Sequence, residues 1–353
     1  MTAPFSLELR QRKSAGFDLL HNSTARRTVE LDLFGRRVAV YANANLSIYS
    51  AQACNARCPF CVEELRPLSR GRGLAEQKVV ESDDERYFGR LRAVLDALTP
   101  LSPTVSITGG EASKDPRLPR LLRDLSTREA RKLTLTTNGS GLLDVREGRP
   151  LVEWIADSCL RHLNVSRAHP DHELNLQLMG YREGLSLVDT ERVLRRLAAT
   201  GRVRPRLSCV LLRRGVADLD GVLGYLRFAE SLGVDNVIFR QLMKSDPETH
   251  APGPVVRFSD AERVPLQPIL EALGERADFS FVQQIVGYYY YVEVWRWRGI
   301  DVVFEEADLA QLERTKRHDD VVHELVFHPN AELASTWQPW DGLLTGPLRR
   351  ALP

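Results

Sequence analysis

Strand-like and helix-like segments alternate along the chain from residue 46 to residue 239. The predicted strands are Leu46–Tyr49, Pro103–Ile107, Lys132–Thr136, His162–Val165, Arg206–Leu212 and Asn236–Phe239. Segments with helical apolar spacing follow or separate them, at Asp84–Leu98, Pro116–Leu125, Leu151–Cys159, Asp189–Ala199 and Leu219–Leu232. This alternation favours six βα units with parallel strands and helical crossovers, in either a doubly wound sheet or a barrel.

The regions on either side of this series have different patterns. Residues 28–41 read as a β-hairpin, residues 245–257 hold three prolines and read as a linker or lid, and Ser259 to Glu262 reads as a capping box that starts a helix. The β-rich runs beyond them are Phe279–Ile285, Tyr288–Trp297, Ile300–Phe304 and Val321–Phe327. The sequence therefore predicts an N-terminal extension (1–43), an α/β domain (44–244) and a C-terminal α+β cap (245–353).

Charge and hydropathy exclude some partners. The 48 Lys and Arg residues nearly balance the 47 Asp and Glu residues, which leaves no electrostatic argument for nucleic acid or a membrane surface. No apolar run approaches the ~18–20 residues that a membrane span needs. Residues 1–20 mix charged with apolar side chains and do not read as a signal peptide. We expect a cytoplasmic protein.

Three of the five cysteines, Cys54, Cys58 and Cys61, form a C-x₃-C-x₂-C motif directly after the first predicted strand. Thiolates are the soft ligands that iron–sulfur clusters and zinc require. A structural zinc site would need a fourth close ligand, and the nearest histidines, His21 and His162, are far away in sequence. A redox dithiol would need only a C-x₂-C pair. The motif favours an iron–sulfur cluster with one iron left open over zinc or a disulfide.

The cysteine motif, with Phe60 just before its third cysteine and a βα series behind it, resembles the signature of radical S-adenosylmethionine (SAM) enzymes. The resemblance implies an α/β fold, a partial (β/α)₆ TIM-like barrel with an N-terminal hairpin and a C-terminal α+β cap. It also implies one [4Fe–4S] cluster on Cys54, Cys58 and Cys61, with SAM bound to the open iron. An electron then cleaves SAM to a 5′-deoxyadenosyl radical, which takes a hydrogen atom from the substrate.

Further motifs of the family match at the ends of later predicted strands. They are Gly-Gly-Glu after the second strand, Thr-Asn after the third, Asn-Val-Ser after the fourth and Gln-Leu-Met after the sixth. Strand ends are where barrel enzymes build their sites. By this resemblance the residues that contact SAM are Phe60 through its backbone, Gly109, Gly110, Glu111, Thr137, Asn138, Ser166 and Met243.

Within the superfamily, residues 44–335 most resemble the GTP 3′,8-cyclase branch of molybdenum-cofactor biosynthesis. No cysteine follows Cys209, so the auxiliary cluster of that branch is not expected. We interpret the chain as a single-cluster relative that acts on a small polar metabolite carrying a sugar, nucleoside or carboxylate. The specific hypothesis is a lyase, a cytosylglucuronate-type decarboxylase of nucleoside antibiotic assembly; epimerisation, dehydration and carbon–carbon bond formation stay open. An electron donor such as flavodoxin or ferredoxin is implied.

Candidate substrate contacts come from two arguments. Arg206 occupies the fifth strand, where the resemblance places a substrate-binding basic residue. Tyr289, Tyr291 and Glu293 share one face of a predicted strand because side chains alternate, and they are candidates to face the barrel mouth. An ordinary aromatic sheet face is the competing interpretation of that run.

Two other functions remain as alternatives. A radical SAM enzyme that modifies ribosomal peptides would have a peptide-docking winged helix before the barrel or auxiliary cysteines after it, and residues 1–45 are too short and strand-rich for the former. A non-enzymatic protein stabilised by zinc or a cluster would explain the cysteines. It would not explain why the other motifs fall at strand ends.

Overall fold

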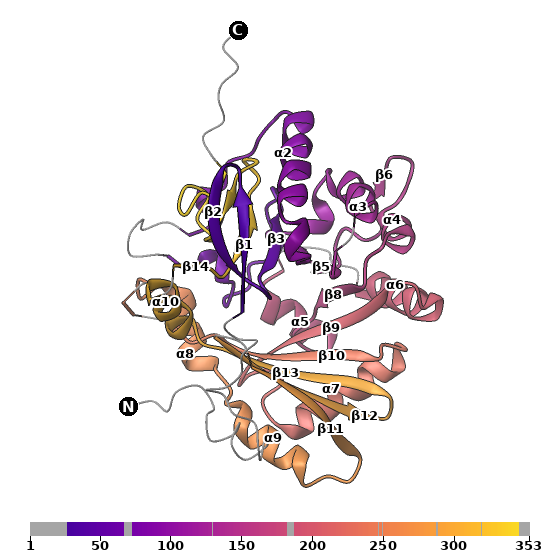
Figure 1. Ribbon diagram of the computed structural model, residues 1–353. Helices are drawn as coiled ribbons and strands as arrows, with labels where there is room; N and C mark the ends of the chain where they lie inside the picture. Colours follow the sequence, from indigo (N-terminus) through magenta and orange to yellow (C-terminus); the bar gives the residue numbers. More distant parts are fainter. Residues whose placement is uncertain are drawn as a thin grey trace.

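A curved, eleven-stranded sheet is the centre of the computed structural model (Figure 1). The model describes residues 27–66, 73–128, 130–181, 187–245, 247–248, 250–286, 289–318 and 320–345. Residues 1–26 of the predicted extension, including the segment tested for a signal peptide, lie outside the described residues. The strand order is β11-β12-β13-β10-β9-β8-β5-β4-β3-β15-β16.

The six predicted strands are all present and lie side by side. They are β3 (Asn45–Tyr49), β4 (Thr104–Thr108), β5 (Lys132–Thr137), β8 (His162–Ser166), β9 (Arg204–Leu211) and β10 (Asn236–Gln241). Each runs parallel to the next in this order. The described strands form an open sheet with edges at β11 and β16, as expected for a partial barrel. The predicted α/β fold class is confirmed.

Five of the helices between these strands pack on the outer side of the sheet (Figure 1). They are α2 (Asp84–Ala97), α3 (Leu118–Ser126), α4 (Leu151–Asp157), α6 (Leu187–Thr200) and α7 (Leu219–Ser231). Alternate strand residues such as Ile48, Leu135 and Phe239 join them in one apolar core. The residues between those positions face inward and are mostly polar, for example Thr134 and Asn164. The inner face of the barrel therefore differs in chemistry from the outer face.

C-terminal strands extend both edges of the barrel sheet. On one side β13 (Ile300–Ala307) pairs in parallel with β10, followed by the antiparallel strands β12 (Tyr290–Trp297) and β11 (Phe279–Val286). On the other side β15 (Leu325–Phe327) pairs in parallel with β3, and β16 (Leu333–Ala334) pairs with β15. Helix α10 (Leu309–His318) connects the two regions. The division at residues 43/44 and 244/245 stays a prediction.

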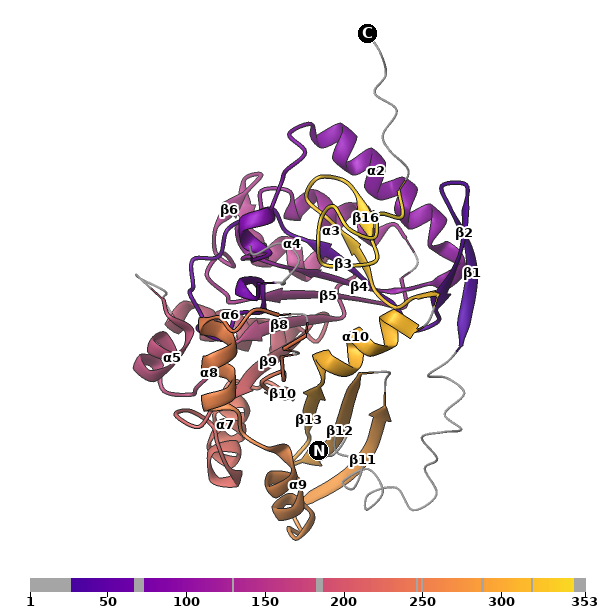
Figure 2. The same cartoon turned by 90° about the vertical axis from the view of Figure 1, so that its left-hand side faces the viewer.

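The predicted N-terminal hairpin is present, with β1 (Thr28–Leu33) and β2 (Arg36–Tyr41) beside α2 (Figure 2). Phe34 and Gly35 both have positive φ, 57° and 83°, which is the two-residue turn that matches strand twist. The short strand β14 (Val321–Val322) pairs in parallel with β2. A second small hairpin joins β6 (Val145–Arg146) and β7 (Arg149–Pro150).

The predicted helix start at Ser259 is wrong. Helix α8 runs from Pro254 to Glu262, so Ser259 lies near its end, and a separate helix α9 follows at Leu266–Gly274. Pro254 occupies the first turn, where its missing N–H and fixed φ favour a helix start. The proline-rich segment therefore contains the first turn of α8. None of the described helices is long and apolar enough to cross a membrane.

Candidate functional site

The three clustered cysteines lie on the loop that leaves the carboxyl end of β3. Cys54 is exposed, Cys58 and Cys61 are half-buried, and all three thiols are free. The N–H of Cys61 donates to the carbonyl of Cys58 (3.0 Å) and closes a turn. The loop is tied to the end of α5 (His172–Met179) because the N–H of Arg57 donates to the carbonyl of Gly180 (3.1 Å). These backbone contacts fix the course of the loop that carries the cysteines.

Burial and mutual repulsion disfavour the charged forms of these thiols in the protein alone. Burial raises the pKa of Cys54, of Cys58 and of Cys61, the last to about 11. The neighbouring cysteines and the carboxylates of Glu63 and Glu111 contribute to these upward shifts. Three thiols that repel one another when charged form a donor set suited to a cationic metal cluster.

The donor set fits a cluster by its chemistry. In a cubane each thiolate binds a different iron, whereas zinc needs its ligands around one ion. Within the described ranges, no group of three or more His, Cys, Asp or Glu is arranged as the ligands of a single ion. Of the other two cysteines, Cys209 is buried in β9 and Cys159 is exposed after α4.

The Gly-Gly-Glu segment after β4 lies against the start of the cysteine loop. Gly109 and Gly110 have positive φ, 86° and 49°. A Cβ on Gly109 would lie 1.9 Å from a ring carbon of Tyr49, and one on Gly110 would lie 1.7 Å from the carbonyl oxygen of Gln52. Both positions therefore require glycine, for conformation and for space.

Glu111 has four hydrogen bonds within the protein. It is 1% exposed, and Oε1 accepts from the N–H of Ser113 (2.9 Å), the hydroxyl of Ser113 (2.5 Å) and the hydroxyl of Thr137. Oε2 accepts from the N–H of Asn138 (2.7 Å). Glu111 thus joins the loop after β4 to the loop after β5. Its expected contact with SAM stays a prediction.

Asn138 connects this network to the cysteine loop. Its Nδ2 donates to the Cys54 sulfur (3.7 Å) and to Oδ1 of Asn55 (2.8 Å). A hydrogen bond to a ligand sulfur is one of the contacts that set the reduction potential of an iron–sulfur cluster. The structure therefore brings Glu111, Thr137 and Asn138 together with Cys54, as the order of the motifs implied.

The remaining SAM candidates lie at the same end of the sheet. Ser166 is the last residue of β8 and Met243 follows β10 by two residues; both are half-buried. The Phe60 ring lies 6.2 Å from that of Phe258 in α8, beside an apolar cluster that includes Met179. The SAM candidates thus come from the cysteine loop and from the ends of β4, β5, β8 and β10.

Lys78 was missed by the sequence analysis. Its Nζ donates to the carbonyl of Gln52 (3.2 Å), lies 3.9 Å from Oε2 of Glu63 and 4.5 Å from the centre of the Tyr49 ring. Burial lowers the pKa of Lys78. This cation stands beside the cysteine loop, and no motif in the sequence marks it.

The candidate substrate contacts divide between the two faces of the sheet. Arg206 faces inward, where burial and then the nearby Arg240 and Arg204 lower its pKa to about 10. Tyr289 precedes β12, and burial together with Glu324 and Glu305 raises its pKa. Arg206 thus lies on the barrel interior, and its contact with a substrate stays a prediction.

Tyr291 and Glu293 are not placed toward the barrel mouth, and that expectation is corrected. They share a face, as the alternation predicted, but it is the outer face, since Glu293 pairs with Phe304 and Phe304 stacks on Phe239 in the helix-packed core. The hydroxyl of Tyr291 donates to Oε1 of Glu293 (2.6 Å), and Nε1 of Trp295 donates to Oε2 (2.8 Å). Glu293 is therefore a buried structural acceptor.

Comparison with known proteins supports the fold. No family model and no curated protein matches the sequence. Among solved structures, Streptococcus suis SuiB bound to S-adenosylmethionine matches with a TM-score of 0.54 and 16% identity over 85% of this chain and 61% of that one. SuiB is a radical SAM enzyme. The fold is that of the radical SAM enzymes.

Other radical SAM structures match less closely. SuiB bound to its precursor peptide SuiA gives a TM-score of 0.48 and 18% identity over 67% of this chain and 46% of that one. Escherichia coli coproporphyrinogen III oxidase, HemN, gives a TM-score of 0.37 and 16% identity, over 67% of this chain and 52% of that one. The chain thus spans about half to three fifths of the length of these proteins. At this identity the likeness describes the radical SAM fold and not the substrate.

Proposed function

We propose that the chain is a radical SAM enzyme that acts on a small polar metabolite. The observation that carries the proposal is the position of Cys54, Cys58 and Cys61 in this fold, at the carboxyl end of β3. Asn138 reaches the Cys54 sulfur, and Gly110 comes against the same loop. The match to SuiB bound to S-adenosylmethionine supports SAM as the ligand.

In this proposal Cys54, Cys58 and Cys61 hold one [4Fe–4S] cluster. When bound, that cluster supplies the electron that cleaves SAM and generates the radical that abstracts hydrogen. Gly109 and Gly110 allow this segment to pack directly against Tyr49 and the carbonyl of Gln52, at the start of the cysteine loop. Glu111 fixes the loop that carries Thr137 and Asn138. Ser166, Met243 and the backbone of Phe60 complete the proposed SAM contacts.

The inner face of the sheet supports a small polar substrate. Thr134, Asn164 and Ser208 face inward and are buried, and Oδ1 of Asn164 has no hydrogen-bond partner in the described part of the chain. Buried polar atoms are normally paired, so this one suits a polar ligand. Decarboxylation of a nucleoside sugar acid, in antibiotic or other natural-product biosynthesis, is the specific reaction we propose. Flavodoxin or ferredoxin would supply the electron, in the cytoplasm.

Anaerobic reconstitution tests the cluster assignment. By thiolate count we expect about four iron and four sulfide per chain. Cys58→Ala should lose the visible absorbance of the cluster and all formation of 5′-deoxyadenosine from SAM and reductant. Cys159→Ser is the matched control, because Cys159 is exposed and lies at the other end of the sheet. A Cys58→Ala protein that cleaves SAM at the wild-type rate would refute the proposal.

A further inference from the structure

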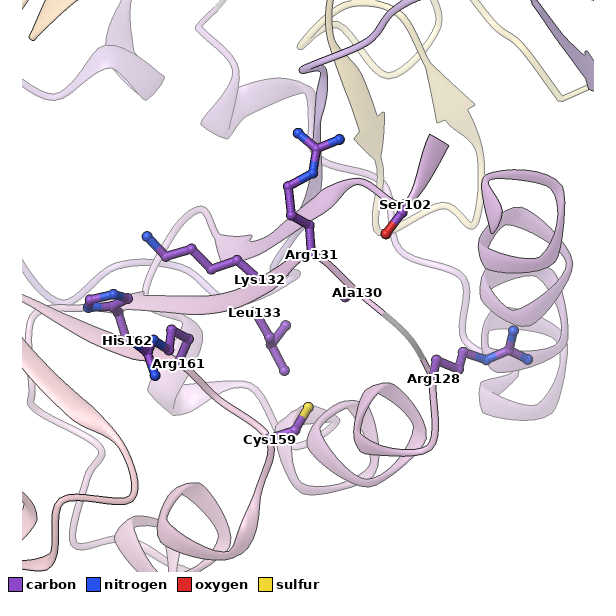
Figure 3. Close-up of a pocket in the computed structure, with 9 residues that line it drawn as sticks. All are labelled: Ser102, Arg128, Ala130, Arg131, Lys132, Leu133, Cys159, Arg161 and His162. Carbon is purple, nitrogen blue, oxygen red and sulfur yellow. The ribbon is translucent and has the colours of Figure 1, made fainter. Parts of the chain in front are cut away.

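A pocket at the amino end of β5 and β8 has a strongly basic lining (Figure 3). Its volume is about 620 Å³. The lining residues are Ser102, Arg128, Ala130, Arg131, Lys132, Leu133, Cys159, Arg161 and His162. None of them is acidic. Strand β8 separates His162 from Ser166, so this pocket lies roughly 13 Å from the proposed SAM contacts, by the rise of a strand.

Two of the four cations in the lining have partners. Arg128 pairs with Asp96, and Arg131 donates to Oδ1 of Asn43 (2.9 Å) and to the carbonyl of Ala42 (3.2 Å). In contrast, the charged groups of Lys132 and Arg161 have no hydrogen bond or ion pair with the residues that the structure describes. These two cations are available to a ligand.

His162 provides an independent observation. Its side chain is 6% exposed, and its Nδ1 has no partner among the described residues. Burial, then Arg206 and Lys132, lowers the pKa of His162 to about 3, so the ring is neutral and carries one N–H donor. A buried polar atom without a partner normally indicates water or a ligand.

Two carboxylates at this end of the sheet, Asp235 and Asp301, are already paired. Arg204 binds Asp235 (2.8 Å) and Asp301 (2.7 Å), and Asp301 also binds Arg296. Arg206, which faces inward beside them, donates only to the amide oxygen of Asn236. The positive charge at this end is therefore not neutralised within the described chain.

The same crowding of positive charge affects the pKa of Lys132. Burial, together with Arg206, Arg161 and Arg204, lowers that pKa to about 8. Each cation thus disfavours the charged form of its neighbours, and a bound anion would relieve that repulsion.

We propose that Lys132, Arg161, His162 and Arg206, here called the basic cluster, bind an oxyanion, the phosphate or carboxylate group of a small molecule. Arg161 offers a planar pair of donors, Lys132 a point charge and His162 a single N–H. The oxyanion is either the end of a substrate whose reacting carbon lies nearer Ser166, in which case the inference rests on the proposed function, or a separate molecule. Nothing in the cysteine motif requires this site.

Calorimetric titration of the full chain with inorganic phosphate tests the site. Wild-type protein should bind phosphate, and Lys132→Gln and Arg161→Gln should each weaken binding roughly tenfold to a hundredfold, as expected for one charge-assisted bond. Arg195→Gln is the matched control, because Arg195 is exposed on α6 and contacts only Glu191. Wild-type phosphate binding by both variants, or no binding to the wild-type protein at millimolar concentration, would overturn the inference.

Thermal unfolding gives a second readout that does not depend on activity. Without phosphate, Lys132→Gln should be at least as stable as wild type, because a repelled cation is removed. A marked loss of stability would mean that Lys132 has a structural role, against the inference. Phosphate should raise the unfolding temperature of the wild-type protein more than that of the variant.

A sugar phosphate distinguishes the two sources of the oxyanion. If the oxyanion belongs to a substrate in the barrel, ribose 5-phosphate should bind more tightly than phosphate, and Asn164→Ala should remove that difference. If it belongs to a separate molecule, the two probes should bind equally. Phosphate binding with no SAM cleavage would refute the proposed function alone, and SAM cleavage without phosphate binding would refute this inference alone.

Discussion

Replacing Glu111 by glutamine keeps the size of the side chain but exchanges one acceptor oxygen for an NH₂ group, which can only donate. Three donors face Oε1, from Ser113 and Thr137, and the N–H of Asn138 faces Oε2. Glutamine can keep the first three bonds only by turning its NH₂ group toward the N–H of Asn138. Glu111→Gln therefore leaves one buried donor without an acceptor.

The magnitude follows from the number of donors left unpaired. One buried, unpaired donor costs about 1–3 kcal/mol, and Glu111→Gln should lower the free energy of unfolding by that amount. Glu111→Ala leaves the N–H groups of both Ser113 and Asn138 unpaired, since the two hydroxyls can rotate to other acceptors. We expect a loss of roughly 2–6 kcal/mol for that variant.

Urea unfolding and SAM titration together measure the effect. Glu111→Ala should keep the cluster but weaken SAM roughly tenfold to a hundredfold, whether through the lost ammonium contact or the loosened loop. Glu147→Gln is the control, because Glu147 is exposed and forms only a surface ion pair with Arg123, so it should change stability by less than about 1 kcal/mol. Stability of Glu111→Gln within about 0.5 kcal/mol of wild type would refute the reasoning.

Three further predictions concern single contacts. Gly110→Ala should abolish SAM binding or folding, because its Cβ would lie 1.7 Å from the Gln52 carbonyl oxygen; an active, stable variant would contradict this. Asn138→Ala should lower the reduction potential of the cluster by roughly 40 mV, the one-electron equivalent of a ~1 kcal/mol bond to the Cys54 sulfur, as measured by anaerobic redox titration. Burial lowers the pKa of His328 to about 4 from 6.5, so its contribution to stability is present above pH 6.5 and is lost as the pH falls toward 4. Between pH 7 and pH 4.5, the free energy of unfolding, measured in urea, should fall by about 2–3 kcal/mol less in His328→Gln than in the wild-type protein.

The sequence predicted local structure well where periodicity is strong. All six barrel strands and the hairpin at residues 28–41 are confirmed. The partners of the C-terminal strands could not be predicted, because β13 pairs with β10 and β15 with β3 across long stretches of chain. Local pattern does not encode which distant edge a strand will join.

The candidate site shows the same limit. Motif order predicted which strand ends carry the site, and the structure brings Glu111 and Asn138 to Cys54. Alternation correctly grouped Tyr291 with Glu293 but could not tell the inner face from the outer, because both faces of this sheet are covered. The charge of Lys132 and Arg161 is plain in the sequence, but only the structure shows that neither has a partner in the described part of the chain.

The pairing of β15 with β3 has a consequence for biosynthesis. Leu325 pairs with Leu46 across a separation of about 280 residues. At a translation rate of 5–20 residues per second, β15 is therefore synthesised roughly 15–55 s after β3. Throughout that time the nascent barrel has an unprotected edge strand, which is a template for pairing with another chain. We expect fragments that stop before residue 320 to aggregate, and expression yield to depend on chaperones that shield β3 until β15 emerges from the ribosome.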